Sequence, residues 1–386
     1  MRGTTRILLA AVVATAGFSG LNGGATAAIG LLAPPPHTQG QPRLVDLPLG
    51  PGLLLDDNTR IPGLVAGQTP RADLRVRPDA HALAHVLALR ATLRDARAAR
   101  ARANVAVAVL LGLLALAAAL LRSPLLARAA VLYAPAAIGL GLAWRSWAAI
   151  GFGALALSLA GAIPARLFRP LLVAVLAGAL LVLWQWPLTN DFATIGPHPD
   201  GGGRFYGLTN QVETMLLAPA LLAGLAAAPL ALVVVGWSKA GADGGGLLVY
   251  AAGYAVLSLG ATRRRLAVAA VVAAALAVVL ALVDAATGGS SHVTHALGGD
   301  LPGDLAHRWR VSYDGVTRSI GAGLMFGFGV ALMLAVAIAN PRRRLVDAML
   351  LALVVSFVVN DTPTDVALWG SLGALALLGF ELARVR

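Results

Sequence analysis

The stretch that decides the fold is residues 104–121, which read NVAVAVLLGLLALAAALL between Arg102 and Arg122. It contains no charged residue. As a helix rising about 1.5 Å per residue, it approaches the length needed to cross a hydrocarbon core about 30 Å thick. Its apolar residues are continuous and leave no polar face for water. The segment therefore predicts a transmembrane helix.

Similar apolar runs recur along the rest of the chain, separated by short polar segments. They lie at residues 127–144, 147–163, 170–187, 211–226, 228–238, 246–261, 266–284, 319–339, 346–359 and 365–382. The runs between residues 211 and 261 contain Pro229 and several glycines, which predicts short or broken helices. Counting an N-terminal apolar stretch, the pattern predicts an all-α, polytopic transmembrane helical bundle of about eleven or twelve spans.

The composition agrees with a lipid environment and limits the partners. Hydrophobic residues make up 58% of the chain, charged residues 12%, and the mean hydropathy is +0.78, whereas soluble proteins have about 25% charged residues. The net charge of +12 comes from arginines in short clusters between apolar runs, with Lys239 the only lysine. This placement excludes nucleic acid as a partner and predicts the lipid bilayer, with anionic head groups at the arginine clusters. The absence of cysteine excludes disulfides and thiolate chemistry.

The N-terminal part divides at about residue 28. Residues 1–28 begin with arginines, continue with an apolar stretch and end in small residues. This pattern is typical of a signal peptide, and an uncleaved first transmembrane helix fits equally well. Residues 29–103, rich in Pro, Gly, Asp and Arg, are the one long polar segment, and we expect it to be short and extracytoplasmic.

The end of that segment leads into the membrane. Residues 81–102 have apolar residues and arginines at helical spacing, which predicts an amphipathic helix at the membrane surface that runs into the next span. Residues 104–386 then form the multi-span domain.

The arginine clusters predict the topology. They are Arg122 with Arg128, Arg166 with Arg169, Arg263–Arg265, Arg342–Arg344, and Arg384 with Arg386. An alternating count of spans puts all of them on one side, which the positive-inside rule identifies as the cytoplasm. The agreement requires three crossings between residues 211 and 263. We therefore expect a multi-pass protein of the cell membrane with both termini cytoplasmic, or with the N-terminus outside if the signal is cleaved.

The same count places four polar segments outside: residues 189–210, 237–246, 284–310 and 360–365. They mix acids, amides, histidines and glycines, whereas the inward loops carry little besides arginine. Ordinary polar turns are the alternative interpretation. We predict an outward-facing site with catalytic candidates Asp191, Asp243, His292 and Asp361. The substrate-binding candidates are Arg204, Tyr206, Asn210, Glu213, Lys239, His295 and Asn360.

The first outward segment suggests oxyanion binding. Backbone N–H groups of Gly201–Gly203 beside the Arg204 guanidinium suit a phosphate or another oxyanion. If the next helix begins near Gly207, Tyr206 and Asn210 lie one turn apart and face one cavity. Glu213 then lies below them near the bilayer boundary, where a carboxylate is costly unless paired. A contact of Glu213 with lipid head groups is the alternative.

The other outward segments allow more than one interpretation. Gly244–Gly246 beside Lys239 predicts either a backbone nest that holds an anion or a flexible turn, and the spacing of a P-loop is absent. Asp361 is expected to cap the helix that follows it, with a role in the shared site as the alternative. His292 and His295 have no recognised metal-ligand spacing, so a hydrogen-bonded loop is favoured over a metal or a Ser–His pair, and no cofactor is identified.

Three short motifs in this order carry a family resemblance: Gly203-Arg204-Phe205-Tyr206-Gly207 with Asn210, Gly241-Ala242-Asp243-Gly244-Gly245, and Ser291-His292-Val293. Residues 80–386 resemble a family of uncharacterised bacterial multi-pass membrane proteins. In that family the helices often follow a secreted domain like alkaline phosphatase or sulfatase. Residues 52–65 look like the tail of such a domain. Its metal ligands and nucleophile are not in this sequence, so the resemblance implies the topology and not phosphatase activity.

Three functions follow from these patterns. The first is a membrane enzyme or carrier that handles an anionic lipid-linked or cell-envelope glycan substrate at the outer face. The second is a multi-span transporter, with broken helices at the solute site. The third is a non-catalytic anchor or accessory subunit of a cell-envelope enzyme, which would then be its partner. The sequence leaves open whether the protein is an enzyme.

Overall fold

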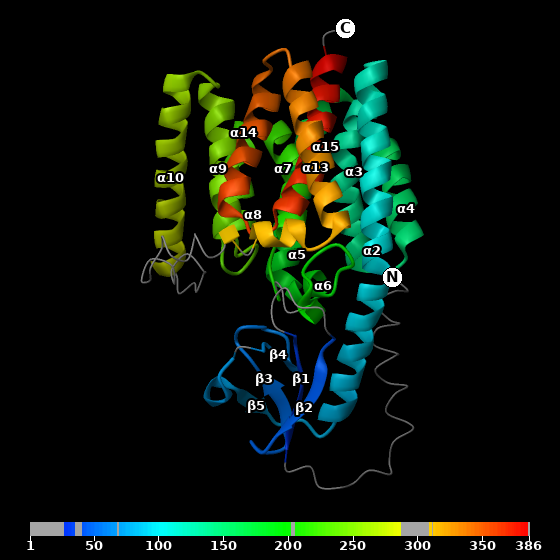
Figure 1. Ribbon diagram of the computed structural model, residues 1–386, viewed down its shortest axis with the longest axis vertical. Coiled ribbons are helices and arrows are strands. Elements are labelled where there is room, and N and C mark those ends of the chain that lie inside the picture. Colours follow the sequence, from blue (N-terminus) through cyan, green and yellow to red (C-terminus); the bar gives the residue numbers. More distant parts are fainter. Residues whose placement is uncertain are drawn as a thin grey trace. The chain divides into compact units, whose positions relative to one another are not determined.

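The computed structural model describes residues 27–34, 41–67, 69–201, 205–286, 309–310 and 312–384. The chain forms two compact units. The sheet unit comprises Met1–Ala101, Leu142–Arg145 and Leu188–Tyr206. The helical unit comprises Arg102–Gly141, Ser146–Pro187 and Gly207–Arg386. Figure 1 labels the strands and helices of both.

A small β-sheet forms the centre of the sheet unit. Its strands are β1 (Ala28–Leu32), β2 (Arg43–Leu47), β3 (Gly52–Leu55), β4 (Leu64–Val65) and β5 (Arg75–Arg77). The order is β2-β1-β3-β5, and β4 also pairs with β1. β1 runs antiparallel to β2 and parallel to β3 and β4, and β3 runs antiparallel to β5. The all-α prediction is therefore wrong for this part of the chain.

The core of the sheet unit joins segments that are far apart in sequence. Leu31, Leu53 and Leu64 from the strands pack with Val86 and Leu93 of the following helix. Phe205, more than a hundred residues further along the chain, belongs to the same buried cluster. The polar segment after residue 187 thus contributes to the core of the sheet unit. Because these partners are distant in sequence, a local hydrophobic pattern does not reveal them.

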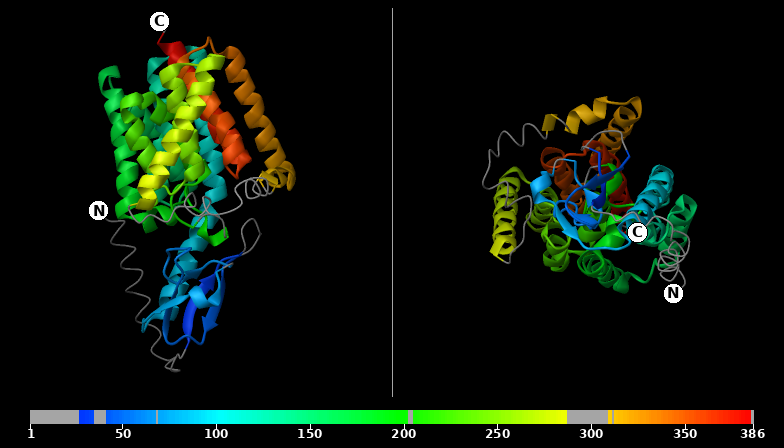
Figure 2. Two further views of the ribbon diagram at one scale, coloured as in Figure 1. Left: turned by 90° about the vertical axis from the view of Figure 1, so that its left-hand side faces the viewer. Right: turned by 90° about the horizontal axis from the view of Figure 1, so that it is seen from below.

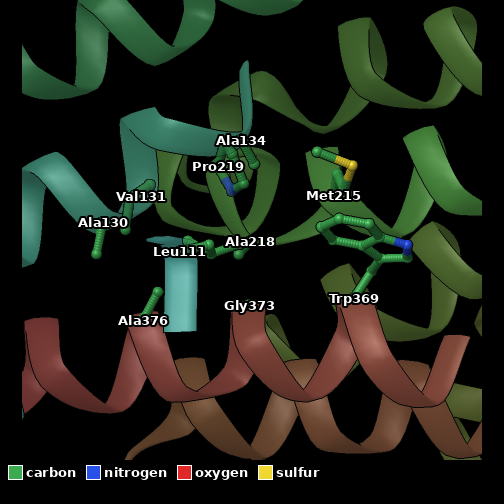
Figure 3. A pocket seen from close by; sticks show the side chains of 10 residues that line it. All are labelled: Leu111, Ala130, Val131, Ala134, Met215, Ala218, Pro219, Trp369, Gly373 and Ala376. Carbon is green, nitrogen blue, oxygen red and sulfur yellow. The ribbon is translucent and has the colours of Figure 1, made fainter. Parts of the chain in front are cut away.

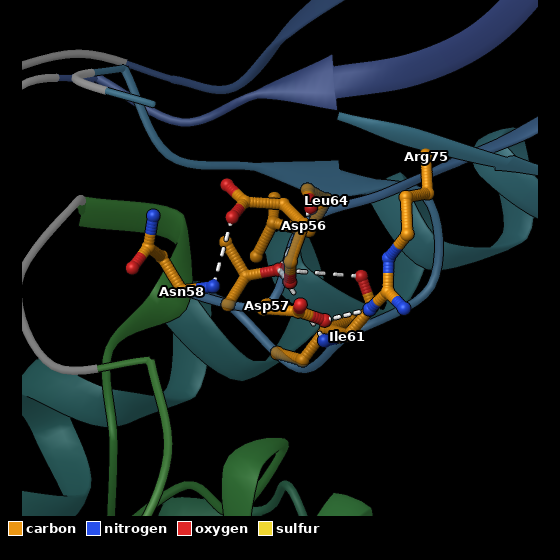
Figure 4. Close-up of polar contacts among 7 residues, drawn as sticks. Asp56, Asp57, Asn58, Ile61, Leu64 and Arg75 are labelled. Carbon is orange, nitrogen blue, oxygen red and sulfur yellow. Dashed lines mark hydrogen bonds and ion pairs between the residues drawn. The ribbon is translucent and has the colours of Figure 1, made fainter. Parts of the chain in front are cut away.

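A buried aspartate closes the turn between β3 and β4 (Figure 4). Asp56 is 4% exposed and accepts hydrogen bonds from the backbone N–H of Asn58 at 2.8 Å and of Ala66 at 2.7 Å. The Thr69 hydroxyl donates a third at 2.7 Å. Buried acceptors of this kind need such donors because they have left water. The Asp56 carboxylate therefore fixes the conformation of the loop through side-chain hydrogen bonds.

Helix α2 (Ala82–Leu121) contains 40 residues without a break, which is about 60 Å of helix. The prediction that residues 81–102 are helical and continue into the first apolar run is confirmed. Val86 and Leu93 on its apolar face pack on the sheet core. This face is thus covered by protein, whereas the sequence predicted that it lies on the membrane surface.

Every apolar run that the sequence identified between residues 104 and 382 is helical. The helices that contain the runs after α2 are α3 (Pro124–Ala143), α4 (Trp147–Ala160), α5 (Ala165–Gln185), α7 (Asn210–Ala223), α8 (Ala228–Gly236), α9 (Gly244–Leu259), α10 (Arg263–Ala286), α13 (Ile320–Ala339), α14 (Arg344–Val359) and α15 (Pro363–Ala383). Among the described residues, 6 helices are long and apolar enough to cross a membrane: α2, α3, α5, α10, α13 and α15. α10 and α13 lie on the outside of the helical unit, with 12% and 17% of their apolar windows buried (Figure 2).

Helices α7 and α8 are short, as the broken pattern between residues 211 and 261 predicted, and together they form a hairpin. Gly224, at φ +94°, ends α7, and the short 3₁₀ helix η4 (Leu225–Ala227) leads into α8. The two ends of the hairpin meet again, because Leu208 N–H donates to the Gly241 carbonyl at 2.9 Å. With 14 residues, α7 is only about 21 Å long. The three full crossings that the predicted topology requires in this stretch are therefore not present. α7 and α8 return to the end of the helical unit where they began, and α9 alone continues from there to the opposite end.

Around α9 and α14, arginines and polar motifs lie at opposite ends of the helical unit. The position of Gly260, where α9 ends, is near the side chains of Arg265 and Arg344. Asn360, where α14 ends, lies instead at Gly245, where α9 begins. Helices α9 and α14 are therefore antiparallel, and the start of α9 is the polar end of the unit. The predicted separation of basic and polar segments is confirmed for these helices.

Between the two ends, the helices pack closely. Leu111, Met215 and Trp369 are among the residues around a cavity of about 10 Å³ (Figure 3). This volume holds one water molecule at most. The helices around this cavity are thus in direct contact, and the polar groups of interest lie at the end of the bundle.

Candidate functional site

The polar end of the helical unit is organised around the first turn of α9. Asp243 is the N-cap of this helix and accepts a hydrogen bond from the Gly246 N–H at 3.1 Å. A side-chain oxygen at this position satisfies one of the N–H groups that a helix start leaves unpaired. Gly244–Gly246 therefore form the beginning of a helix, and the flexible-turn interpretation is wrong.

Glu213 approaches the same turn from α7. It is fully buried, and its carboxylate lies where a β-carbon on Gly246 would be. Only glycine leaves room for this approach. The Tyr250 hydroxyl donates to the Glu213 carbonyl at 2.8 Å, which fixes α7 beside α9. The positive end of the helix dipole favours a carboxylate here.

Asn360 comes to the start of α9 from the end of α14. Its Oδ1 lies where a β-carbon on Gly245 would be, and the Asp243 carboxylate lies 3.4 Å from that same position. Its Nδ2 donates to the Ser356 hydroxyl at 2.8 Å. Asn360 is 6% exposed. It thus forms part of the buried layer with Glu213 and Asp243.

Asp361 forms an accessible layer with the start of α7. Asn210 Nδ2 donates to Asp361 Oδ1 at 2.7 Å and to the Thr362 hydroxyl at 3.0 Å. Asp361 is exposed, and Asn210 and Thr362 are half-buried. The N-cap of α15 is Thr362, without a side-chain cap. The predicted capping role of Asp361 is therefore wrong, because its carboxylate is bound to Asn210.

Five of the residues predicted from the sequence thus come together, and we call them the polar cluster: Asn210, Glu213, Asp243, Asn360 and Asp361. They derive from α7, α9 and the α14–α15 junction. The glycine-rich turn was expected to hold an external anion. The structure places the chain's own carboxylates of Asp243 and Glu213 there instead, because both lie against the first turn of α9. Lys239 is exposed in the turn before Asp243.

Asp191 and Tyr206 belong to the sheet unit. Asp191 ends the short helix α6 (Pro187–Asp191) and is 2% exposed. Burial raises the pKa of its carboxyl to about 7, against the lowering effects of the Asn190 hydrogen bond and the Arg60 charge. The Arg60 guanidinium lies over the Tyr206 ring, 3.8 Å from its centre. Because α7 begins at Asn210, Tyr206 does not share a helical face with it, and that prediction is wrong.

The remaining candidates, Arg204, His292 and His295, lie outside the described residues.

Sequence reasoning missed two polar contacts of the helical unit. Gln211 Nε2 donates to Asn104 Oδ1 at 3.0 Å, and the Ser238 hydroxyl donates to Asp284 Oδ1 at 2.8 Å. Each of these polar residues is near the end of an apolar run, which is the signal that could have identified them. Within the described ranges, no group of three or more His, Asp or Glu side chains could hold a metal ion.

Comparison with protein-family models, curated proteins and solved structures found no match to this chain.

Proposed function

We propose that the protein is an integral, multi-pass membrane protein whose polar cluster handles the sugar part of an anionic lipid-linked or cell-envelope glycan substrate. The observation that carries this proposal is the two-layered cluster, in which the accessible Asp361 and Asn210 lie beside the buried Glu213, Asp243 and Asn360. Carboxylate and amide groups are the side chains that pair with the hydroxyl groups of a sugar.

Asp361 is the group suited to acid–base chemistry. It is exposed, and the Asn210 amide fixes one of its carboxylate oxygens at 2.7 Å. A positioned carboxylate of this kind accepts a proton from a reacting hydroxyl. Asp243 is better explained as a structural group because its carboxylate caps α9. Asp361 is therefore the proposed catalytic residue, and Asn210 orients its carboxylate.

The side of the membrane follows from charge. The arginines at the opposite end of the helical unit favour the cytoplasmic face. The polar cluster then faces the outside, where envelope precursors are used. The cell membrane is the proposed location, with the C-terminus in the cytoplasm and the anionic head groups of the inner leaflet as partners of the arginines.

The experiment uses the full chain in nanodiscs with a panel of polyprenyl-phosphate-linked sugars. Binding is measured by native mass spectrometry and turnover by product analysis. Asp361→Asn should keep binding within about threefold and lower turnover about a hundredfold or more. Asp314→Asn, at an exposed aspartate of the same unit, is the control. Unchanged turnover in Asp361→Asn, or no binding of any of these substrates by the wild type, would contradict the proposal.

A transporter is the second candidate, and the α7–α8 hairpin favours it. Short helices with a break at Gly224 resemble the discontinuous helices that bind solutes in transporters. Uptake into proteoliposomes separates the two functions. A transporter should accumulate the sugar substrate unchanged and lose uptake in Glu213→Gln, whereas an enzyme should convert the substrate without accumulation.

A further inference from the structure

The sheet unit contains a second polar site, an open cleft of about 440 Å³ along the first half of α2. Arg90, Arg94 and Arg97 line it from the helix, and Gln41, Pro42 and Asp200 contribute to its other walls. The three arginines are four and three residues apart, so they share one face of α2. The volume lies within the range of about 300–1,000 Å³ typical of small-molecule sites.

The charges around the cleft are unbalanced toward positive. Asp200 is 2% exposed and forms a hydrogen-bonded ion pair with Arg100 at 3.1 Å, while Arg97 lies 3.9 Å from its other oxygen. Asp95 lies 3.7 Å from Arg94. Arg90, Arg94, Arg97 and Arg100 supply four positive charges against two from Asp95 and Asp200, which leaves an excess of two.

One end of the cleft is formed by a buried ion pair, and the rest is lined by exposed arginines. Arg100 is 11% exposed at its side chain, whereas Arg94 is 74% and Arg97 44% exposed. The buried Asp200–Arg100 pair anchors the 3₁₀ turn η3 (Pro199–Gly201) to the helix. Arg90, Arg94 and Arg97 line the same cleft at exposed positions of the helix.

We propose that this cleft binds a diphosphate group, carried either by a soluble molecule or by a lipid. Guanidinium groups form paired hydrogen bonds with phosphate oxygens, and adjacent arginines on one helix face match two linked phosphates. Like charges at this spacing repel each other and destabilise the helix, and a bound anion would reduce this repulsion. This proposal rests on the sheet unit alone and stands whether or not the polar cluster handles a substrate.

The test uses the full chain in nanodiscs of zwitterionic lipid and titrates inorganic pyrophosphate by calorimetry. A parallel arm titrates a polyprenyl diphosphate. Binding in the first arm identifies a soluble source, and binding in the second arm alone identifies a lipid source. Arg90→Gln/Arg94→Gln should weaken whichever binding is seen about tenfold or more. Arg102→Gln, which removes an exposed arginine of α2 that does not line the cleft, is the matched control.

A charge-preserving variant separates a shaped site from a positive patch. Arg90→Lys/Arg94→Lys keeps the net charge but loses the paired hydrogen bonds, so it should also bind more weakly than the wild type. Circular dichroism checks that each variant keeps its helical content. The proposal is overturned if neither diphosphate binds at millimolar concentration. It is also overturned if the lysine variant binds as tightly as the wild type, or if Arg102→Gln weakens binding as much as the double variant.

Discussion

The carboxylate of Glu213 lies directly against the α-carbon of Gly246, so that a buried acid of α7 fills the space over the first turn of α9. The contact joins two elements that the hairpin turn of α8 separates in sequence. It also explains why Gly246 lies in the first turn of a helix, where glycine is otherwise unfavourable. The first prediction concerns this contact.

Gly246→Ala should destabilise the helical unit by about 1–3 kcal/mol. The added methyl group would overlap the Glu213 carboxylate and Val235, and one of them must move. Gly178→Ala is the control, because a β-carbon there meets nothing within 4 Å and alanine is the better helix former. The unfolding temperature in detergent is the measurement. Equal unfolding temperatures for the two variants would show that the contact is loose.

Asp243→Ala should cost about 1 kcal/mol, whereas Asp243→Asn should cost much less. The alanine variant loses the oxygen that accepts from the Gly246 N–H, and the asparagine keeps an acceptor of the same shape. Thermal unfolding of both variants provides the comparison. If Asp243→Asn lost as much stability as Asp243→Ala, the negative charge and not the capping hydrogen bond would be the important property.

Asp191 should make the stability of the sheet unit depend on pH. Its folded-state pKa of about 7 lies above the unfolded value of about 3.9. Between these values the folded state binds more protons, so stability falls as pH rises from about 4 to about 7, by up to about 1.4 kcal/mol per pH unit.

The measurement is the unfolding temperature from pH 4 to pH 8. Asp191→Asn should lack this fall and should be more stable than the wild type at pH 8. Asp46→Asn, at an exposed position of β2, should keep the wild-type profile. A wild-type profile in Asp191→Asn would show that Asp191 is ionised throughout this range in the folded protein.

Asp56→Ala should destabilise the sheet unit by about 2–4 kcal/mol. The change leaves the buried N–H of Ala66 and the Thr69 hydroxyl without the oxygen that they share. Asp57→Ala is the matched control next to it. Asp57 is exposed and pairs with Arg75 at the surface, where such pairs contribute about 0–1 kcal/mol. Limited proteolysis of the loop between β3 and β4 measures the difference, and equal cleavage of the two variants would contradict the prediction.

The positions of the long helices could be predicted from the sequence alone. Each apolar run is helical because a continuous apolar segment can satisfy its backbone hydrogen bonds internally and needs no polar neighbour. The shortness of α7 and α8 was also predictable, since Pro229 and the glycines interrupt the apolar pattern there, but their return to the same end as a hairpin was not. The separation of arginines from polar residues at the two ends of α9 and α14 also agrees with the alternating pattern of the loops in the sequence.

Only the tertiary structure decided the sheet and the roles of the acids. The strands have two to five residues, too few for a clear alternation, and part of their core is Phe205, far away in sequence. The sequence alone does not distinguish the roles of Asp243, Asp361 and Glu213. Which one caps a helix, which one is accessible and which one is buried depends on the side chains that packing brings next to each, and that is a property of contacts distant along the chain.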